Sequence, residues 1–206
     1  SLLRIRVWKM AEDQHVLLFN IHHIITDAWS MKILIDEWTQ QYQSIVNGQA
    51  LEQTALPIQY KDYAAWINTR LSTGQLAEAA DYWTNCFAGE LPRLDLPLDF
   101  NRPSIRTFAG KTIVQPLEAK QYQRLKAFGK ERQLTVFTPL SALVNTLLFH
   151  LTGQEDIVVG TTIAGRNRQE LQEQIGFYIN TLALRTTFKG SDDFESLLDS
   201  IQANIQ

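Results

Sequence analysis

The sequence is short of the residues that build disulfide-linked or zinc-stabilised folds. Cys86 is the only cysteine among 206 residues, which excludes an internal disulfide and a cluster of thiolates for structural zinc. So little cysteine is typical of proteins in a reducing compartment, and we therefore expect a cytoplasmic protein.

Charge of one sign and long apolar runs are also missing. The 19 basic and 22 acidic residues give a formal net charge of -3, and the sequence has no dense basic run. We therefore expect neither nucleic acid nor an anionic membrane surface as a partner. No apolar run approaches the roughly 18 residues of a membrane helix, and the first residues do not resemble a signal peptide.

What the sequence does have is enough apolar residues for a core. With 45% of them, the chain can bury one substantial core or two smaller ones, and the composition is that of a globular protein. The sequence begins without Met, in a pattern typical of a strand, and it ends in a pattern typical of a helix. We therefore expect an excerpt of a longer polypeptide.

The order of the expected elements predicts an α/β fold. Apolar residues alternate along residues 3–7 and 15–21 on either side of a polar turn, which is typical of a β-hairpin. Thr26 or Asp27 can cap the helix that follows. Its apolar stripe continues at helical spacing until Asn47, and we expect this face to lie in the core. Further helices are predicted over residues 60–72, 76–87, 116–132 and 135–151, strands over 108–115, 157–163 and 177–188, and a last helix capped by Asp192.

Residues 21–30, IHHIITDAWS, bring proton-handling side chains together at the end of a predicted strand. Such junctions often carry functional residues, because a rigid scaffold presents a short loop there. Successive side chains of a strand point to opposite faces, so we expect His23 to lie with Ile21 and His22 to point away. A metal hydrolase that uses His22, His23 and Asp27 is therefore disfavoured, and we expect no metal site.

Two later blocks support a specific interpretation of this motif. YKDYAAW at residues 60–66 and IGFYINTLALR at residues 175–185 resemble the later conserved blocks of condensation domains from nonribosomal peptide synthetases. Beside them, HHIITDA at residues 22–28 resembles that family's His-His-x-x-x-Asp-Gly active-site motif, and the three blocks follow the family's order. Ala28 stands where the family usually has Gly, so a conformation or a close approach of substrate that Gly permits would be resisted, and activity would be reduced or retuned.

The resemblance implies a chloramphenicol-acetyltransferase-like α/β fold, a two-lobed pseudo-dimer with a tunnel between the lobes. Residues 1–90 would form the later part of the N-terminal lobe with the active-site motif. Residues 91–105, rich in proline, would connect the lobes, and residues 106–206 would form the first part of the C-terminal lobe. The sequence would then lack both ends of the domain, and the arginine that usually pairs with the motif aspartate would lie outside it.

The resemblance also implies an acyltransferase-type enzyme of secondary metabolite biosynthesis. The amine of an acceptor aminoacyl thioester would attack a donor acyl or peptidyl thioester and form an amide. Both substrates would be carried on phosphopantetheine arms of donor and acceptor peptidyl carrier domains, next to an adenylation domain of the same synthetase. No cofactor would be bound intrinsically.

Roles for individual residues follow from the same resemblance. His23 would accept the amine proton or orient the amine, because imidazole changes protonation near neutral pH. His22 and Asp27 would support it, with the Asp27 carboxylate held by an arginine. Residues expected to line the tunnel or to support the motif are Ala28, Trp29, Ser30, Asn180 and Arg185.

Several of these signals also have plainer interpretations. Trp29 lies on a helical stripe and is expected in the core, and Arg185 is expected in an ion pair. Arg166 and Arg168 are expected in a solvated loop, with contact to a carrier domain or a phosphate as the less favoured alternative.

Related functions within the family remain alternatives. Trp29 and Ser30 after the motif favour the type that joins two L-configured residues, but ester-forming, starter N-acylating and epimerising domains share the pattern. A non-catalytic recruiting module of the same fold is a further alternative, against which the intact His23 and Asp27 speak.

Overall fold

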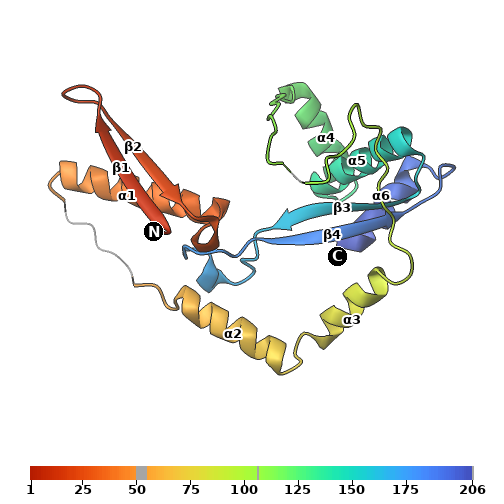
Figure 1. Ribbon diagram of the computed structural model, residues 1–206, viewed down its shortest axis with the longest axis horizontal. Coiled ribbons are helices and arrows are strands. Elements are labelled where there is room, and N and C mark those ends of the chain that lie inside the picture. The colour runs from red at the N-terminus through yellow and green to blue at the C-terminus, as the bar shows by residue number, and fades with distance from the viewer. Residues whose placement is uncertain (50–54, 106, 206) are drawn as a thin grey trace. The chain divides into compact units, whose positions relative to one another are not determined.

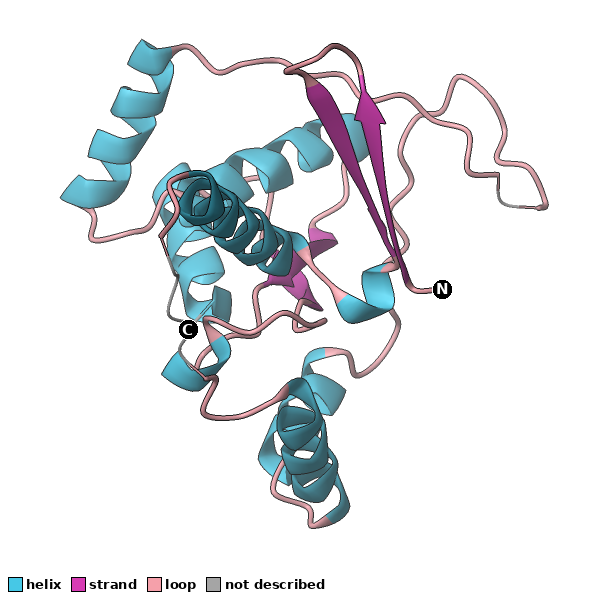
Figure 2. Ribbon diagram, turned by 90° about the vertical axis from the view of Figure 1, so that its left-hand side faces the viewer, coloured by secondary structure: helices cyan, strands magenta, loops and turns pink. Residues whose placement is uncertain are grey.

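The computed structural model describes residues 1–49, 55–105 and 107–205 (Figure 1). The described part contains both helices and strands, with five consecutive α-helices between two pairs of strands, which confirms the α/β prediction (Figure 2). The chain forms two compact units, which are described separately. The first unit consists of Ser1–Tyr82 and Thr162–Leu182, and the second of Trp83–Thr161 and Ala183–Gln206.

The first unit begins with the predicted hairpin. Strands β1 (Leu3–Lys9) and β2 (His15–Ile21) pair antiparallel, with Leu3 opposite Ile21. A 3-10 turn, η1 (His23–Ile25), then leads into helix α1 (Ala28–Val46). The next helix of this unit is α2 (Tyr60–Ser72), and α3 (Ala77–Cys86) runs on into the second unit.

Helix α1 has the predicted ends but not the predicted core face. Asp27 caps its N-terminus and Asn47 follows its last turn, as expected. Ile35, Tyr42 and Ile45 are 48%, 57% and 75% exposed, however, so their stripe is not a core face of the described chain. Amphipathic spacing shows which face of a helix is apolar, but it does not show what covers that face.

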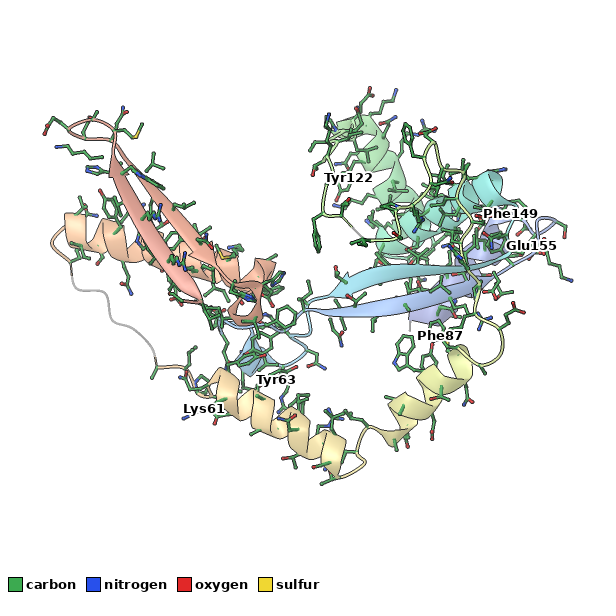
Figure 3. All side chains as sticks on the ribbon, in the orientation of Figure 1. Lys61, Tyr63, Phe87, Tyr122, Phe149 and Glu155 are labelled. Carbon is green, nitrogen blue, oxygen red and sulfur yellow. The ribbon has the colours of Figure 1, made fainter. Side chains whose placement is uncertain are left out.

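The second unit has its core between helices. Helices α4 (Ala119–Glu131), α5 (Phe137–Thr152) and α6 (Phe194–Ile205) belong to it. The phenyl ring of Phe149, labelled in Figure 3, lies 5.6 Å from that of Phe188, measured between ring centroids. The buried cluster consists of Ala142, Leu197, Leu198 and Ile201.

Strands β3 (Asp156–Ile163) and β4 (Asn180–Thr187) form a second two-stranded sheet. The sequence predicted β4 from residue 177, but residues 177–179 contribute to the site described below instead of a strand ladder. Residues 91–105 contain neither helix nor strand, and the division of the chain into lobes at this segment stays a prediction.

Two local predictions are wrong. No strand forms over residues 108–115, where Ile113 and Val114 are 91% and 82% exposed, and a strand needs both a neighbouring strand and cover for its apolar side chains. The side chain that caps the last helix is Asp193, which accepts from the Ser196 amide at 2.8 Å, whereas Asp192 accepts from the Lys189 amide.

Candidate active site

The two adjacent histidines lie beyond the strand, in the turn between β2 and α1. His22 is the N-cap of η1, and its Nδ1 accepts a hydrogen bond from the Ile24 amide at 3.0 Å. The turn cap therefore orients His22, and not the strand alternation that the sequence suggested, because both histidines lie beyond β2. An acceptor Nδ1 also means that neutral His22 carries its proton on Nε2.

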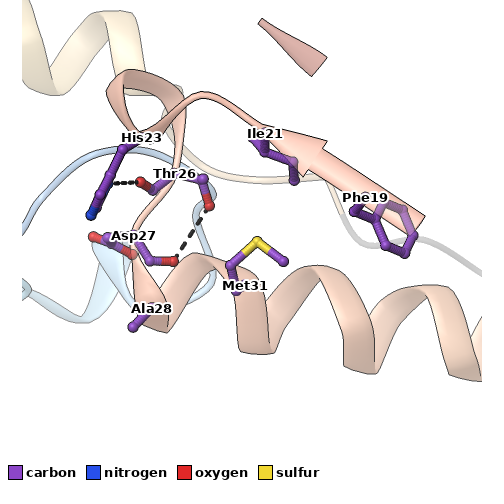
Figure 4. Close-up of a pocket in the computed structure, with 7 residues that line it drawn as sticks. All are labelled: Phe19, Ile21, His23, Thr26, Asp27, Ala28 and Met31. Carbon is purple, nitrogen blue, oxygen red and sulfur yellow. Dashed lines mark hydrogen bonds between the residues drawn. The ribbon is translucent and has the colours of Figure 1, made fainter. Parts of the chain in front are cut away.

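His23 is held in the opposite tautomer. Its Nδ1 lies 2.6 Å from the carbonyl oxygen of Thr26, and because a carbonyl only accepts, Nδ1 carries the proton. The imidazole ring packs against the Phe177 ring in a T-shaped contact, with ring centroids 5.3 Å apart and ring planes at 81°. Figure 4 shows the hydrogen bond between His23 and Thr26. Within the described chain no hydrogen bond reaches His23 Nε2, so the neutral ring keeps a lone pair there.

Asp27 is buried and receives three donors. Its Oδ1 accepts from the Ser30 amide at 2.8 Å and from Arg166 Nη2 at 3.3 Å, and its Oδ2 accepts from the Tyr178 amide at 3.0 Å. Burial by itself would raise the pKa of Asp27, but the two amide donors, the Ser30 side chain and the positive charge of Arg166 together lower it. The carboxylate therefore stays ionised, and it ties the first turn of α1 to two later segments of the chain.

Arg166 is the residue that the sequence placed wrongly. It is only 7% exposed and forms a buried ion pair with Asp27, so the prediction of a solvated loop is wrong for this residue. The arginine partner of the motif aspartate, expected outside the sequence, thus lies inside it. Arg168 remains at the surface, 3.6 Å from Glu170.

The Arg166 guanidinium is fixed by further contacts. Nη1 donates to the carbonyl oxygens of Leu171 and of Gln174, the latter at 2.7 Å. The guanidinium carbon lies 4.1 Å from the ring centroid of Tyr178. The preceding residue, Gly165, is the sequence signal that could have located Arg166. Its φ is +66°, and a Cβ added to it would lie 2.1 Å from the carbonyl oxygen of Tyr178, so this position requires glycine.

Ser30, like Asp27, takes part in several hydrogen bonds of this network. It is fully buried, and its hydroxyl donates to the Gly176 carbonyl at 2.8 Å while accepting from the Gly176 amide at 3.0 Å and from Arg166 Nη2 at 2.7 Å. A Cβ at Gly176 would lie 2.4 Å from a ring carbon of Tyr60, so only glycine fits there. The first turn of α1 is thereby hydrogen bonded to the residues that precede β4.

The sequence did not single out Tyr178 and Gln174. The Tyr178 hydroxyl donates to Gln174 Oε1, and Gln174 Nε2 donates to the Ile58 carbonyl at 2.6 Å. Burial raises the pKa of Tyr178 to about 12, so its hydroxyl keeps its proton. The Tyr178 ring packs against the ring of Tyr63, which is labelled on α2 in Figure 3, with ring centroids 4.8 Å apart.

The remaining predicted residues lie in several places. Trp29 is 46% exposed, so the prediction of a core residue is wrong, and its indole N–H donates to the Gln172 carbonyl at 2.9 Å. Asn180 lines a separate pocket of about 460 Å³. Arg185 lies in the second unit, where Nη2 donates to Asp156 Oδ2 at 2.7 Å, which confirms the expected ion pair.

A pocket of about 310 Å³ opens beside His23. The side chains around it come from the end of β2, the turn and the beginning of α1, as Figure 4 shows. Ala28, the first residue of α1, is among them. The lining residues are Phe19, Ile21, His23, Thr26, Asp27, Ala28 and Met31.

Neither a cluster of metal ligands nor a membrane span occurs in the described part of the chain. Among residues 1–49, 55–105 and 107–205, no three His, Cys, Asp or Glu side chains lie close enough together to hold a metal ion. None of the described helices is both long and apolar enough to cross a membrane.

Known proteins resemble this chain in sequence and in fold. The chain is 40% identical over 201 residues to a linear gramicidin synthase of Brevibacillus parabrevis, and 38% identical over 203 residues to bacitracin synthase 1 of Bacillus licheniformis. Each alignment covers 98% of this chain but only 3% or 4% of the relative. The chain therefore spans a small part of these synthetases.

Solved structures agree with the sequence relatives. The first condensation domain of the CDA synthetase superposes with a TM-score of 0.81 at 19% identity, over 99% of this chain and 45% of that one. The X-domain from teicoplanin biosynthesis superposes with a TM-score of 0.86 at 25% identity, over 99% of this chain and 46% of that one. The fold is thus the chloramphenicol-acetyltransferase-like α/β fold of these domains, of which this chain covers just under half. The sequence profile described as "Condensation domain" matches residues 1–206, and the chain belongs to the condensation-domain family of nonribosomal peptide synthetases.

Proposed function

We propose that the complete domain forms amide bonds between two carrier-bound thioesters, with His23 as the residue that handles the proton. The observation that carries this proposal is the state of the imidazole. Nδ1 is fixed by the Thr26 carbonyl, while Nε2 is left with a lone pair beside a pocket. A base needs this combination of fixed orientation and a free acceptor atom.

The proposed reaction balances without a cofactor. The neutral amine of the acceptor attacks the carbonyl carbon of the donor thioester, an N–C bond forms and the C–S bond breaks. As the N–C bond forms, the nitrogen becomes acidic, and its proton passes to Nε2 of His23 and then to the departing thiolate, which leaves as a thiol. A free α-amine has a pKa of about 7.7 to 8.0, so a useful fraction is neutral near pH 7 before it meets the enzyme.

Asp27, Ser30 and Arg166 are proposed to position this imidazole and to take no part in proton transfer. Both oxygens of Asp27 are occupied by donors of the protein, and Ser30 is fully buried. The network fixes the end of the turn whose Thr26 carbonyl orients His23. His22 supports the same turn from its other end, through its bond to the Ile24 amide.

The substrates and partners are proposed from the family. The donor is an acyl or peptidyl thioester, and the acceptor is an aminoacyl thioester, both on phosphopantetheine arms of peptidyl carrier domains. An adenylation domain of the same synthetase would lie nearby. Trp29 and Ser30 favour a domain that joins L-residues.

A non-catalytic recruiting role is the second candidate. It is favoured by the likeness to the X-domain from teicoplanin biosynthesis, a domain whose structure is also known in complex with OxyB. The free Nε2 of His23 and its fixed tautomer speak for catalysis, because a recruiting surface has no need of either.

Single-turnover kinetics of the complete domain test the proposal. With loaded donor and acceptor carrier domains, His23→Ala should slow amide formation at least about 100-fold, because positioned acid and base groups contribute about 10²- to 10⁴-fold. His15→Ala is the matched control, since His15 is an exposed histidine at the other end of β2. A His23→Ala rate equal to that of the parent domain would refute the role.

A further inference from the structure

The pocket beside His23 is apolar on two of its sides. Phe19 and Ile21 contribute from β2, and Met31 and Ala28 contribute from α1. Phe19 is held in place by an edge contact with Trp38, with ring centroids 6.3 Å apart and planes at 81°. A group that enters this pocket exchanges water for fixed hydrocarbon walls, which favours apolar groups.

The polar atoms around the pocket already have partners. The Thr26 carbonyl accepts from His23 Nδ1, and both carboxylate oxygens of Asp27 accept from amides. The charge of Asp27 is balanced by Arg166, so no unpaired charge faces the pocket from this side. A polar or charged side chain that entered would exchange water for hydrocarbon walls on two sides, which is unfavourable.

His23 is one of the lining residues, and its Nε2 accepts no hydrogen bond within the described chain. The Thr26 hydroxyl, which also lines the pocket, donates to the Asp27 carbonyl. The pocket therefore combines hydrocarbon walls with an imidazole that keeps an open acceptor. We infer that it receives the apolar side chain of the acceptor residue, with the reacting amine at Nε2. This inference rests on the proposed function and narrows its substrate class to acceptors with uncharged, apolar side chains.

The pocket has room for a side chain of moderate size. About 310 Å³ corresponds to roughly ten water molecules at about 30 Å³ each, which accommodates a leucyl or phenylalanyl side chain. Ala28 determines part of this volume. Among the described residues, Gln133 is the only non-glycine residue with positive φ, so Ala28 lies in ordinary helical backbone that does not require glycine. The difference between Ala and Gly here is therefore the space that one methyl group fills.

Acceptor competition in the complete domain tests the inference. Leucyl and asparaginyl pantetheine thioesters have side chains of similar size but opposite polarity, and lysyl pantetheine adds a charge. We expect kcat/KM for amide formation to be at least about tenfold higher for leucyl than for either polar acceptor. If asparaginyl and lysyl acceptors react as fast as leucyl, the inference is overturned and the proposed function stands. If no acceptor reacts, the proposed function itself fails.

Variants of Ala28 test the size limit. Ala28→Val should lower kcat/KM for a phenylalanyl acceptor at least about tenfold more than for an alanyl acceptor, and Ala28→Gly should shift the ratio the other way. Ala77→Val is the matched control, because Ala77 is the exposed first residue of α3 as Ala28 is of α1. The proposal that Ala28 limits the size of the acceptor side chain is refuted by two results together. In Ala28→Val, kcat/KM would fall equally for the phenylalanyl and alanyl acceptors, and in Ala28→Gly the ratio of these two kcat/KM values would not change.

Discussion

Replacing Arg166 by methionine should destabilise the domain more than a typical substitution. The guanidinium makes four hydrogen bonds, to the Leu171 and Gln174 carbonyls, to Asp27 and to Ser30, whereas its Nε has no partner among the described residues. Its loss leaves a buried carboxylate without a counter-charge. Removing one partner of a buried ion pair typically costs about 3 to 5 kcal/mol of unfolding free energy. Asp27 keeps two amide donors, so we expect a value near the lower end.

A double-mutant cycle shows whether the ion pair itself is responsible. In Asp27→Asn the remaining group is neutral, so adding Arg166→Met should cost less than it does alone. We expect a coupling of about 1 to 3 kcal/mol between the two sites. The measurement is urea unfolding of the complete domain at neutral pH, with equal m-values required for the comparison.

The control for this cycle is Arg168→Met. Arg168 lies two residues further along the same loop but is exposed. It has a 3.6 Å contact to Glu170 and lies 5.4 Å from the ring centroid of Trp66, and because both contacts are at the surface we expect a much smaller loss than in Arg166→Met. The role of the ion pair is refuted if Arg166→Met behaves like Arg168→Met, or if the Asp27 and Arg166 effects simply add.

Three further predictions concern the same network. Gly165→Ala should lower the melting temperature of the domain more than Gly74→Ala does. Both glycines have φ near +70°, but only at Gly165 would the new Cβ clash with a neighbour, the carbonyl oxygen of Tyr178 at 2.1 Å. Equal decreases in melting temperature would contradict this. Ser30→Ala should cost about 1 to 3 kcal/mol in urea unfolding, since it leaves buried partners unpaired, and a neutral effect would show that water replaces the hydroxyl. Because the folded-state pKa of Asp27 is lowered, its contribution to stability is complete above the unfolded carboxyl pKa of about 3.9 and is lost as pH falls through the lower folded value. Urea midpoints measured down to about pH 3 should therefore fall less steeply in Asp27→Asn than in the parent domain, and equally steep curves would contradict this.

Local patterns were sufficient where the structure depends on neighbours in sequence. The β1–β2 hairpin, the Asp27 cap and the Asn47 end of α1 follow from alternation and capping chemistry, which act over a few residues. The three motif blocks also identified the family before any geometry was known.

Long-range partners cannot be predicted from such local patterns. Asp27 and Arg166 are 139 residues apart, and nothing in the composition of a loop indicates that one of its arginines is buried. The prediction of a core face on α1 is wrong for a related reason. Ile45 has the spacing of a core residue but is exposed, because spacing does not show which segment covers a helix face. Gly165 was the available clue, because a glycine next to a charged residue can mark a place where two backbones approach closely.

The opposite tautomers of His22 and His23 give the turn two rings that differ in hydrogen bonding. Neutral His23 donates from Nδ1 to the Thr26 carbonyl and keeps Nε2 as an acceptor. Neutral His22 accepts at Nδ1 from the Ile24 amide and keeps its N–H at Nε2 as a donor. Two adjacent residues of the same type are therefore not interchangeable, because a ligand would have to donate to the one ring and accept from the other.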